Sequence, residues 1–547
     1  MSDLKHYIVT LKSFEDIESF RDDMETPGGN LFIPDRSIDV IRERPSTLSI
    51  DYWLTKDEAD LVRQDSRVLA VEIKPETIGF KPTPLFTQTS SNWNKSSSVN
   101  NNHLNWGLLR CFEGKQRSNW GGTGSVTVTG TIDIVAEGRN VDVVIVDGHL
   151  NPSHPEFAVN SDGTGGTRVI QYNWFQHNSV VNPYDNRTTY SYLPYTGTDV
   201  NGNNNHGAHV GGTVAGNTQG WARKANIYNI NPYGYSNPPP EFTDIDSIDL
   251  VEYIREFHKN KPINPATGRK NPTIVNNSWG YSRGIYASDI EWVNYRGVNY
   301  YPPFTDDQLR NFGIVTFGGI SAAPIRYTAL DTAIQLAINE GIIFLGAASN
   351  DYTKIDVPGG PDYENYWVES IQGFFYSIAY QQGTSPGAAP NVICVGAVSN
   401  AVNERKADFS NCGPRVDIFA PGDQIMSALN AGTVTDARNS AYYLGKLSGT
   451  SMATPQVTGM LACVLETYPH YNQSQIKDYL LNTAKSGQMS SGTGGYDDYT
   501  DLNGAPNRYM AFKAERTLSG RTFPKTTYSY RPVTGKVFPR NRVRKAP

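Results

Sequence analysis

The sequence lacks the features that mark disulfide-rich, membrane-spanning and polyanion-binding proteins. It has few cysteines and no metal-type spacing between them, the four being Cys111, Cys394, Cys412 and Cys463. No apolar run approaches the ~20 residues that span a bilayer, and the net charge of −6 gives no overall signature of a polyanion partner. We therefore expect no membrane span, no nucleic-acid partner, and core thiols at Cys394 and Cys463, which stand in apolar runs.

The first residues also lack the apolar core of a secretory signal. Residues 1–6, MSDLKH, are largely polar, so we expect a cytoplasmic protein. The 547 residues leave room for one large domain with smaller attachments. The 50 glycines and 33 prolines indicate a loop-rich enzyme rather than a helical bundle.

Residues 1–80 carry the pattern of a small α+β unit of the ferredoxin-like kind. A strand is expected at 6–11 and another at 67–73. Two stretches that resemble capping boxes, Ser13-Phe14-Glu15-Asp16 and Thr55-Lys56-Asp57-Glu58, each predict the start of a helix. Residues 81–104, rich in Ser, Asn and Thr, predict a linker.

A larger domain is predicted over residues 105–512. Short β-branched runs alternate there with helical stretches, which is typical of a parallel α/β sheet. Strands are expected at 141–146, 226–230, 273–276, 342–345 and 392–395, and helices at 245–259, 327–340, 452–466 and 473–484. Long insertions, at about 158–200 and 280–325, are expected on the surface.

Residues 513–547 predict an extended basic tail. From Arg516 onward there are nine Lys or Arg and no Asp or Glu, interleaved with aromatic residues and prolines. Two interpretations stay open: a solvated terminus, or an anchor that docks on an acidic partner, another subunit or nucleic acid. Tails of this kind resemble termini of bacteriophage virion components, so a virion-associated location is a second expectation beside the cytoplasm.

The run Gly449-Thr450-Ser451-Met452-Ala453-Thr454-Pro455 predicts a nucleophile at Ser451. A helix N-terminus offers free N–H groups and a positive dipole end, which stabilise developing negative charge. The same run also fits an ordinary helix whose N-cap is Ser or Thr. The prediction therefore depends on the motifs that accompany it.

Two further motifs predict the partners of Ser451. Residues 143–148 read as a buried strand that delivers the carboxylate of Asp147, and residues 206–213 begin a small-residue helix with His206 in its first turn. These motifs and their order Asp, His, Ser resemble the subtilisin-like serine peptidases. The resemblance implies a parallel sheet flanked by helices and an activity against polypeptides.

The residue types fit a proton-transfer relay. Ser451 needs a positioned base, and an imidazole such as that of His206 can take and return the proton. Asp147 would accept a hydrogen bond from the other ring nitrogen and stabilise the imidazolium. His209 and His154 are expected to be structural.

The resemblance also assigns an oxyanion donor and a substrate strand. Residues 347–350 resemble the family's Ala-Ala-Gly-Asn, which makes Asn350 the second donor, although an Asn after a strand is often a turn residue. Ser278, Trp279 and Gly280 match a family segment whose backbone pairs with extended peptide. Trp279 is expected to make a broad apolar contact with substrate side chains.

Three features limit the resemblance. His149 stands where the family has Gly, which puts the loop behind Asp147 in doubt, and Gln456 replaces the family's His. The short stretch 216–220 lacks the strong calcium loop of some subtilisins. We expect no required cofactor, with structural calcium left open. The acidic residues after Asn350 predict a solvated loop, or alternatively a pocket for basic substrates.

Residues 1–80 resemble the inhibitory propeptide of subtilisin-like zymogens, and Asn105-Trp106-Gly107 resembles a mature N-terminal segment. We therefore predict a serine endopeptidase made as a self-processing zymogen, with its own propeptide as inhibitor and cleavage between about 76 and 104. A non-hydrolytic structural protein and an esterase with the same triad are the alternatives.

Overall fold

The computed structural model describes residues 4–33, 40–79, 81–84, 105–112, 136–190, 205–233, 245–316, 318–371, 374–401, 403–490, 492 and 499–512. The predicted tail and most of the predicted linker lie outside these ranges. Every helix within them is too short or too polar to cross a bilayer. All four cysteines are buried and free, which confirms the prediction for Cys394 and Cys463.

Residues 4–79 form a four-stranded antiparallel sheet with two helices, in the βαββαβ order of ferredoxin-like units. The elements are β1 (Lys5–Leu11), α1 (Asp16–Glu25), β2 (Val40–Arg44), β3 (Ser49–Leu54), α2 (Lys56–Val62) and β4 (Val68–Ile73), and the sheet order is β2-β3-β1-β4. The capping box at Thr55 and Glu58 is formed. The box predicted at Ser13 is wrong, because α1 begins at Asp16 and its N-cap, Glu15, makes no side-chain cap.

An eight-stranded sheet forms the centre of residues 136–512. Its order is β21-β22-β17-β16-β13-β8-β6-β7, and the strands are β6 (Asp142–Val146), β7 (Asn226–Ile230), β8 (Thr273–Asn277), β13 (Ile343–Ala347), β16 (Ile393–Val398), β17 (Ile418–Pro421), β21 (Lys485–Ser486) and β22 (Arg508–Tyr509). All neighbours are parallel except β21 and β22. The buried, apolar strands are those of a sheet covered on both faces, which confirms the predicted fold class.

Two helix pairs flank this sheet: α5 packs on α9, and α6 packs on α8. Helix α9 also lies against β8, β13, β16 and β17. The helices of this part are α3 (Trp106–Phe112), α4 (Asn178–Val181), α5 (His206–Ala215), α6 (Ser247–Asn260), α7 (Asp306–Asn311), α8 (Thr328–Asn339), α9 (Thr450–Thr467) and α10 (Gln473–Thr483). Gly459 permits the close approach of α9 to α5, since a Cβ there would lie 2.5 Å from the Val214 carbonyl oxygen.

The insertion at 280–325 is part of the folded body and not a surface loop alone. It contributes β10 and β11 to the sheet β11-β10-β14-β15, and β12 and most of β9 to the sheet β12-β9-β5. A third small sheet has the order β18-β20-β19. These strands are β5 (Lys81–Pro84), β9 (Trp279–Tyr286), β10 (Ile290–Tyr295), β11 (Val298–Tyr300), β12 (Ile320–Pro324), β14 (Tyr366–Ile371), β15 (Phe374–Ile378), β18 (Ile425–Leu429), β19 (Val434–Asp436) and β20 (Asn439–Leu447). Tyr281, Ile285 and Val293 are buried in the main core, so the expectation of a surface insertion is wrong for this segment.

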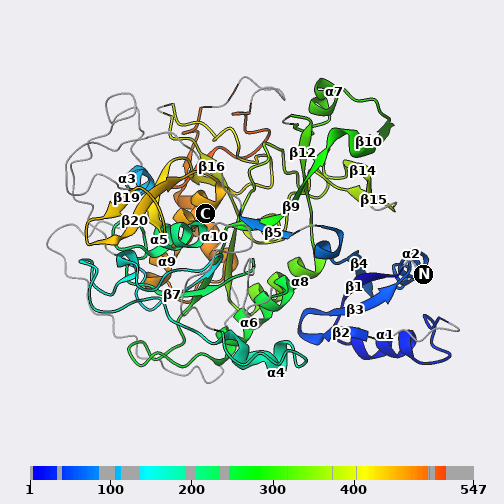
Figure 1. Ribbon diagram of the computed structural model, residues 1–547, viewed down its shortest axis with the longest axis horizontal. Coiled ribbons are helices and arrows are strands. Elements are labelled where there is room, and N and C mark those ends of the chain that lie inside the picture. The colour runs from blue at the N-terminus through cyan, green and yellow to red at the C-terminus, as the bar shows by residue number, and fades with distance from the viewer. Residues whose placement is uncertain are drawn as a thin grey trace, which may run out of the picture. The chain divides into compact units, whose positions relative to one another are not determined.

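The N-terminal unit contacts α6 and α8 (Figure 1). Glu72 of β4 accepts hydrogen bonds from the first amides of α8, at 3.0 Å from Thr328 N and 3.3 Å from Ala329 N. A carboxylate at a helix N-terminus satisfies free N–H groups and interacts favourably with the helix dipole. Glu72 therefore caps a helix of the other part of the chain.

A second contact between these parts is a buried ionic cluster. Arg42 donates to Asp249 of α6 at 2.6 Å, and Arg44 contacts Asp249 at 3.4 Å and Asp246 at 3.3 Å. Lys74 lies 2.7 Å from Asp246. The interface thus holds charges of both signs out of water.

Candidate active site

Asp147 and His206 form a buried pair at the end of the central sheet. Asp147 directly follows β6, His206 begins α5, and Nδ1 of His206 lies 2.7 Å from Oδ1 of Asp147, with both side chains fully buried. Burial raises the pKa of Asp147, and His206 beside it opposes the rise. Because an ionised carboxylate only accepts hydrogen bonds, the pair places the proton on Nδ1 and leaves Nε2 of a neutral ring as the basic nitrogen.

The backbone segments around the Asp147–His206 pair are closely packed against each other. A Cβ at Gly207 would lie 1.9 Å from the carbonyl oxygen of Gly148, so only glycine lets α5 begin here. Asn229 of β7 holds the loop from the strand side, with its Nδ2 donating to Ile145 O at 2.8 Å and Asp147 O at 3.1 Å. Sequence reasoning missed Asn229. The sequence feature that could have identified it is a polar residue inside a buried strand, where polar groups are almost always hydrogen-bonded.

His149 does not disturb the loop. Its backbone lies outside the left-handed region that would require glycine, and its ring is 3% exposed and 6.2 Å from the ring of Tyr190. Burial lowers its pKa to about 3, so the ring is neutral near pH 7. The departure from the family pattern is therefore accommodated by core packing.

Two other histidines have structural contacts, in agreement with the sequence analysis. His209 donates from Nε2 to the carbonyl oxygen of Ile425 at 2.7 Å, and burial lowers its pKa to about 3. His154 lies 3.0 Å from the carbonyl oxygen of Tyr443 through Nε2 and accepts from the Glu156 N–H through Nδ1.

Ser451 is the second residue of α9 and is joined to Ser278 by two hydrogen bonds. Pro455, four residues later, has no N–H to give to the Ser451 carbonyl, so that carbonyl is left without its helical partner. The hydroxyl of Ser278 donates to it at 3.0 Å, and the hydroxyl of Ser451 donates to the Ser278 carbonyl at 2.8 Å. The hydrogen bond expected from Ser451 to His206 stays a prediction, although α5 and α9 pack together.

Asn350 presents an amide nitrogen beside the start of α9. Its Oδ1 accepts from the backbone N–H of Thr450 at 2.9 Å and from the Thr450 hydroxyl at 3.0 Å. These two bonds fix which end of the amide faces Thr450. Its Nδ2 is buried, and in the described part of the chain no acceptor lies within hydrogen-bond distance. A donor is thus held next to the residue that precedes Ser451.

The predicted substrate strand is occupied by the chain's own residues 81–84. Strand β5 pairs antiparallel with β9, with Pro84 opposite Trp279 and Thr83 opposite Gly280. The indole of Trp279 is 2% exposed and packs edge-on against Tyr281. Its expected broad contact with substrate side chains stays a prediction, because β5 is paired with this segment in the structure.

Gln456, the second departure from the family pattern, is a core hydrogen-bonding residue. Its Oε1 accepts from Trp221 Nε1 at 2.7 Å and from Asn105 Nδ2 at 2.9 Å. Its Nε2 donates back to Asn105 Oδ1 at 2.8 Å. Gln456 therefore links α9 to the residue that precedes α3.

The acidic residues after Asn350 do not form a solvated loop. The five are Asp351, Asp356, Asp362, Glu364 and Glu369, of which Asp356, Asp362 and Glu369 are each 1% exposed. Asp362 lies 2.7 Å from both Lys354 and Arg296, and Glu369 lies 2.7 Å from Arg283. Pairing within the chain also argues against a pocket for basic substrates. Over the described ranges, no three His, Cys, Asp or Glu side chains are grouped to hold a metal ion.

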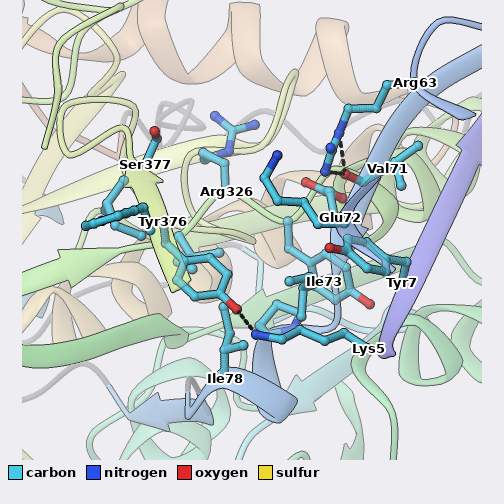
Figure 2. Close-up of a pocket in the computed structure, with 16 residues that line it drawn as sticks. Lys5, Tyr7, Arg63, Val71, Glu72, Ile73, Ile78, Arg326, Tyr376 and Ser377 are labelled. Atoms are coloured by element: carbon cyan, nitrogen blue, oxygen red, sulfur yellow. Dashed lines mark hydrogen bonds between the residues drawn. The ribbon is translucent and has the colours of Figure 1, made fainter. Parts of the chain in front are cut away.

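A cavity of about 620 Å³ lies away from these residues, between the N-terminal unit and β15. Lys5 Nζ donates to the hydroxyl of Tyr376 across it at 2.5 Å, and Glu72 lies at its wall (Figure 2). None of the candidate site residues lines it. It therefore belongs to the interface and not to the candidate active site.

The fold and the site define a parallel α/β protein with a carboxylate–imidazole pair at a strand end and a serine at a helix start. Residues 138–507 match the Subtilase family, which is more than half of the chain. The chain belongs to this family.

Subtilisin E of Bacillus subtilis (strain 168) is 26% identical over 352 residues, which cover 63% of this chain and 61% of the relative. Alkaline serine exoprotease A of Vibrio alginolyticus is 24% identical over 374 residues, covering 68% of this chain and 46% of the relative. Fervidolysin from Fervidobacterium pennivorans, a keratinolytic enzyme related to subtilisin, is a similar solved structure with TM-score 0.49 and 17% identity, covering 92% of this chain and 60% of that chain. The chain thus spans about three fifths of the length of Subtilisin E.

Proposed function

We propose that the chain is a serine endopeptidase that hydrolyses peptide bonds and is made as a self-processing zymogen. The observation that carries the proposal is the buried Asp147–His206 hydrogen bond together with the free amide donor of Asn350 beside the start of α9. Membership of the Subtilase family supports it.

The chemistry follows from these groups. His206 Nε2 takes the hydroxyl proton of Ser451 as Oγ attacks the carbonyl carbon of the scissile bond. Asp147 stabilises the imidazolium that forms. The oxyanion accepts hydrogen bonds from Asn350 Nδ2 and the Ser451 N–H. His206 then gives its proton to the leaving amine, and water hydrolyses the acyl-enzyme by the same steps.

The substrate is an extended peptide that adds a strand to β9. The antiparallel pairing of residues 81–84 with Trp279–Ser282 supports this mode, because it is a peptide already bound to that edge. Backbone pairing selects extended conformation and leaves side-chain preference to other contacts. Unfolded protein is therefore the expected test substrate.

The zymogen proposal rests on the same pairing. The N-terminal unit is held on α6 and α8 by Glu72 and the ionic cluster, and β5 continues from it onto β9. An incoming substrate cannot pair with β9 while β5 is there. Ser451 cuts the chain a short distance after Pro84, and loss of the N-terminal unit then frees the edge.

A comparison of the wild type with Ser451→Ala tests both parts of the proposal. We expect the wild type to run on a gel as a shortened chain, to react with a fluorophosphonate probe and to cleave unfolded casein, while Ser451→Ala stays full length and unlabelled. Absence of labelling after removal of the N-terminal unit would indicate a non-hydrolytic protein. Turnover of small esters without casein cleavage would indicate an esterase.

A further inference from the structure

We propose that Ser349 is a positioning residue for the oxyanion donor: its hydroxyl, bonded to Asp351, holds the turn that presents Nδ2 of Asn350. The inference rests on the proposed peptidase function. It concerns a residue that stands where the family resemblance has glycine.

The backbone of Ser349 is in a conformation that residues with a side chain rarely adopt. Its φ is +85°, in the left-handed region, and the residue is fully buried. Such a conformation is disfavoured for a residue with a Cβ and persists only where neighbouring contacts hold it. The turn from β13 into Asn350 therefore needs a compensating interaction.

The side chain of Ser349 makes that interaction. Its hydroxyl donates to the carboxylate of Asp351, two residues on. The bond closes the turn around Asn350, the residue between the two partners.

Asn411 anchors both partners from a separate loop. Its N–H donates to the carbonyl of Ser349 at 3.0 Å, and its Oδ1 accepts from the N–H of Asp351 at 2.9 Å. The same oxygen accepts from the N–H of Thr353 at 3.1 Å. Asn350 is thus held at both backbone ends by Asn411 and at its side-chain oxygen by Thr450.

Alanine and glycine at position 349 separate the two properties of the serine. Ser349→Ala keeps the Cβ that disfavours this φ and removes the hydroxyl that compensates for it. Ser349→Gly removes both, and glycine adopts the left-handed region readily. A small displacement of an oxyanion donor lowers the rate of the chemical step with little effect on substrate binding.

The experiment measures kcat and KM of the processed enzyme on a peptide substrate. We expect Ser349→Ala to lower kcat about tenfold with KM within about twofold, and Ser349→Gly to recover most of that loss. Asn350→Ala should lower kcat by about 10²–10³-fold, and Ser349→Ala should cause no further loss in that background. Asp351→Ala, which removes the acceptor and leaves Ser349 intact, should reproduce the loss and serves if Ser349→Ala does not fold.

Three outcomes overturn the inference: an unchanged kcat in Ser349→Ala and Asp351→Ala, an equal loss in Ser349→Gly, or additive losses in the double variant with Asn350→Ala. Failure of the proposed function looks different. In that case the processed wild type would show no peptide hydrolysis above that of Ser451→Ala.

Discussion

The chain buries carboxylates in two regions and pairs them differently. In the candidate active site, Asp147 faces one imidazole, and within the described part of the chain no donor reaches its second oxygen. At the interface with the N-terminal unit, Asp246 and Asp249 face the guanidinium groups of Arg42 and Arg44. The first pair joins a carboxylate to an imidazole, a group that can take and give a proton, while the second joins carboxylates to guanidinium groups, which stay charged at any physiological pH.

In the proposed mechanism, this difference separates a site that moves protons from a contact that holds two parts of the chain together. An imidazole beside a carboxylate can change protonation within the range where enzymes work. Buried guanidinium–carboxylate contacts repay the desolvation of the charges only while every partner is present. Substitutions that keep the shape of a side chain should therefore still lower activity at the site. At the interface, substitutions that remove a charge should lower stability.

Replacing Asp147 with Asn is the sharpest test of the first half of this comparison. Asparagine keeps the shape but can donate toward Nδ1, which disfavours the tautomer that leaves Nε2 basic, and we expect kcat to fall by about 10⁴-fold. Asp142→Asn, at the other end of β6 where Asp142 pairs with Lys261 at 2.9 Å, is the matched control. It should alter stability and leave kcat near the wild-type value, whereas equal losses in both variants would contradict the assignment of Asp147.

Replacing Arg44 with Met tests the interface. Arg44 is 3% exposed and contacts Asp51, Asp246 and Asp249. Because its loss leaves buried carboxylates unpaired, we expect the free energy of unfolding of the full-length Ser451→Ala chain to fall by about 3–5 kcal/mol in urea titrations.

Lys56→Met is the control for this experiment, since it removes an ion pair with Asp60 that is largely exposed. We expect no measurable change in unfolding for that variant. Equal effects of the two substitutions would show that burial of the Arg44 contacts does not increase their contribution to the free energy of unfolding.

Gly207→Ala tests whether the site is held by backbone fit. The added Cβ would meet the Gly148 carbonyl oxygen at 1.9 Å, so α5 must move away from Asp147, and we expect a loss of about 1–3 kcal/mol in stability together with a lower kcat. Gly284→Ala in β9 is the control, because its Cβ would lie 3.3 Å from the nearest atom, a methyl of Ile320. A Gly207→Ala enzyme with wild-type kcat would show that the loop at Gly148 can shift to accommodate the added Cβ without loss of activity.

Features carried by local patterns could be predicted from the sequence. Over residues 105–512, the five strands and four helices predicted by range agree with the structure to within a few residues, and the parallel sheet is confirmed. Asp147 at a strand end, and His206 and Ser451 at helix starts, follow from the same patterns. Their catalytic roles remain part of the proposal.

Features that join distant segments could not be predicted. Asn229 lies 82 residues from its acceptor at Asp147, and Arg44 lies 205 residues from Asp249. The pairing of β5 with β9 likewise depends on where the N-terminal unit docks. No local periodicity encodes such contacts, and the failed capping box at Ser13 shows that a short motif can also be overridden within its own segment.

The smallest predicted effect is a pH dependence of the interface at Glu72. Burial raises the pKa of this carboxyl to about 7 from its ordinary value of 4.5, against the opposing hydrogen bonds from Thr328 and Ala329. Since the docked form holds the proton more tightly, docking is strongest below about pH 4.5 and weakens as the pH rises toward 7. The pKa of Asp249, raised to about 6 by burial, adds a dependence of the same sign.

We therefore expect the unfolding free energy of full-length Ser451→Ala to fall between pH 5 and pH 7, by no more than about 1 kcal/mol per pH unit for Glu72. Glu72→Gln should reduce this slope without abolishing it, because Asp249 still titrates. Glu364→Gln, at an exposed carboxyl outside the interface, should leave the slope unchanged. A slope that Glu72→Gln does not alter would mean that Glu72 stays ionised at the end of α8, and the pH dependence of the interface would then come from Asp249 and not from Glu72.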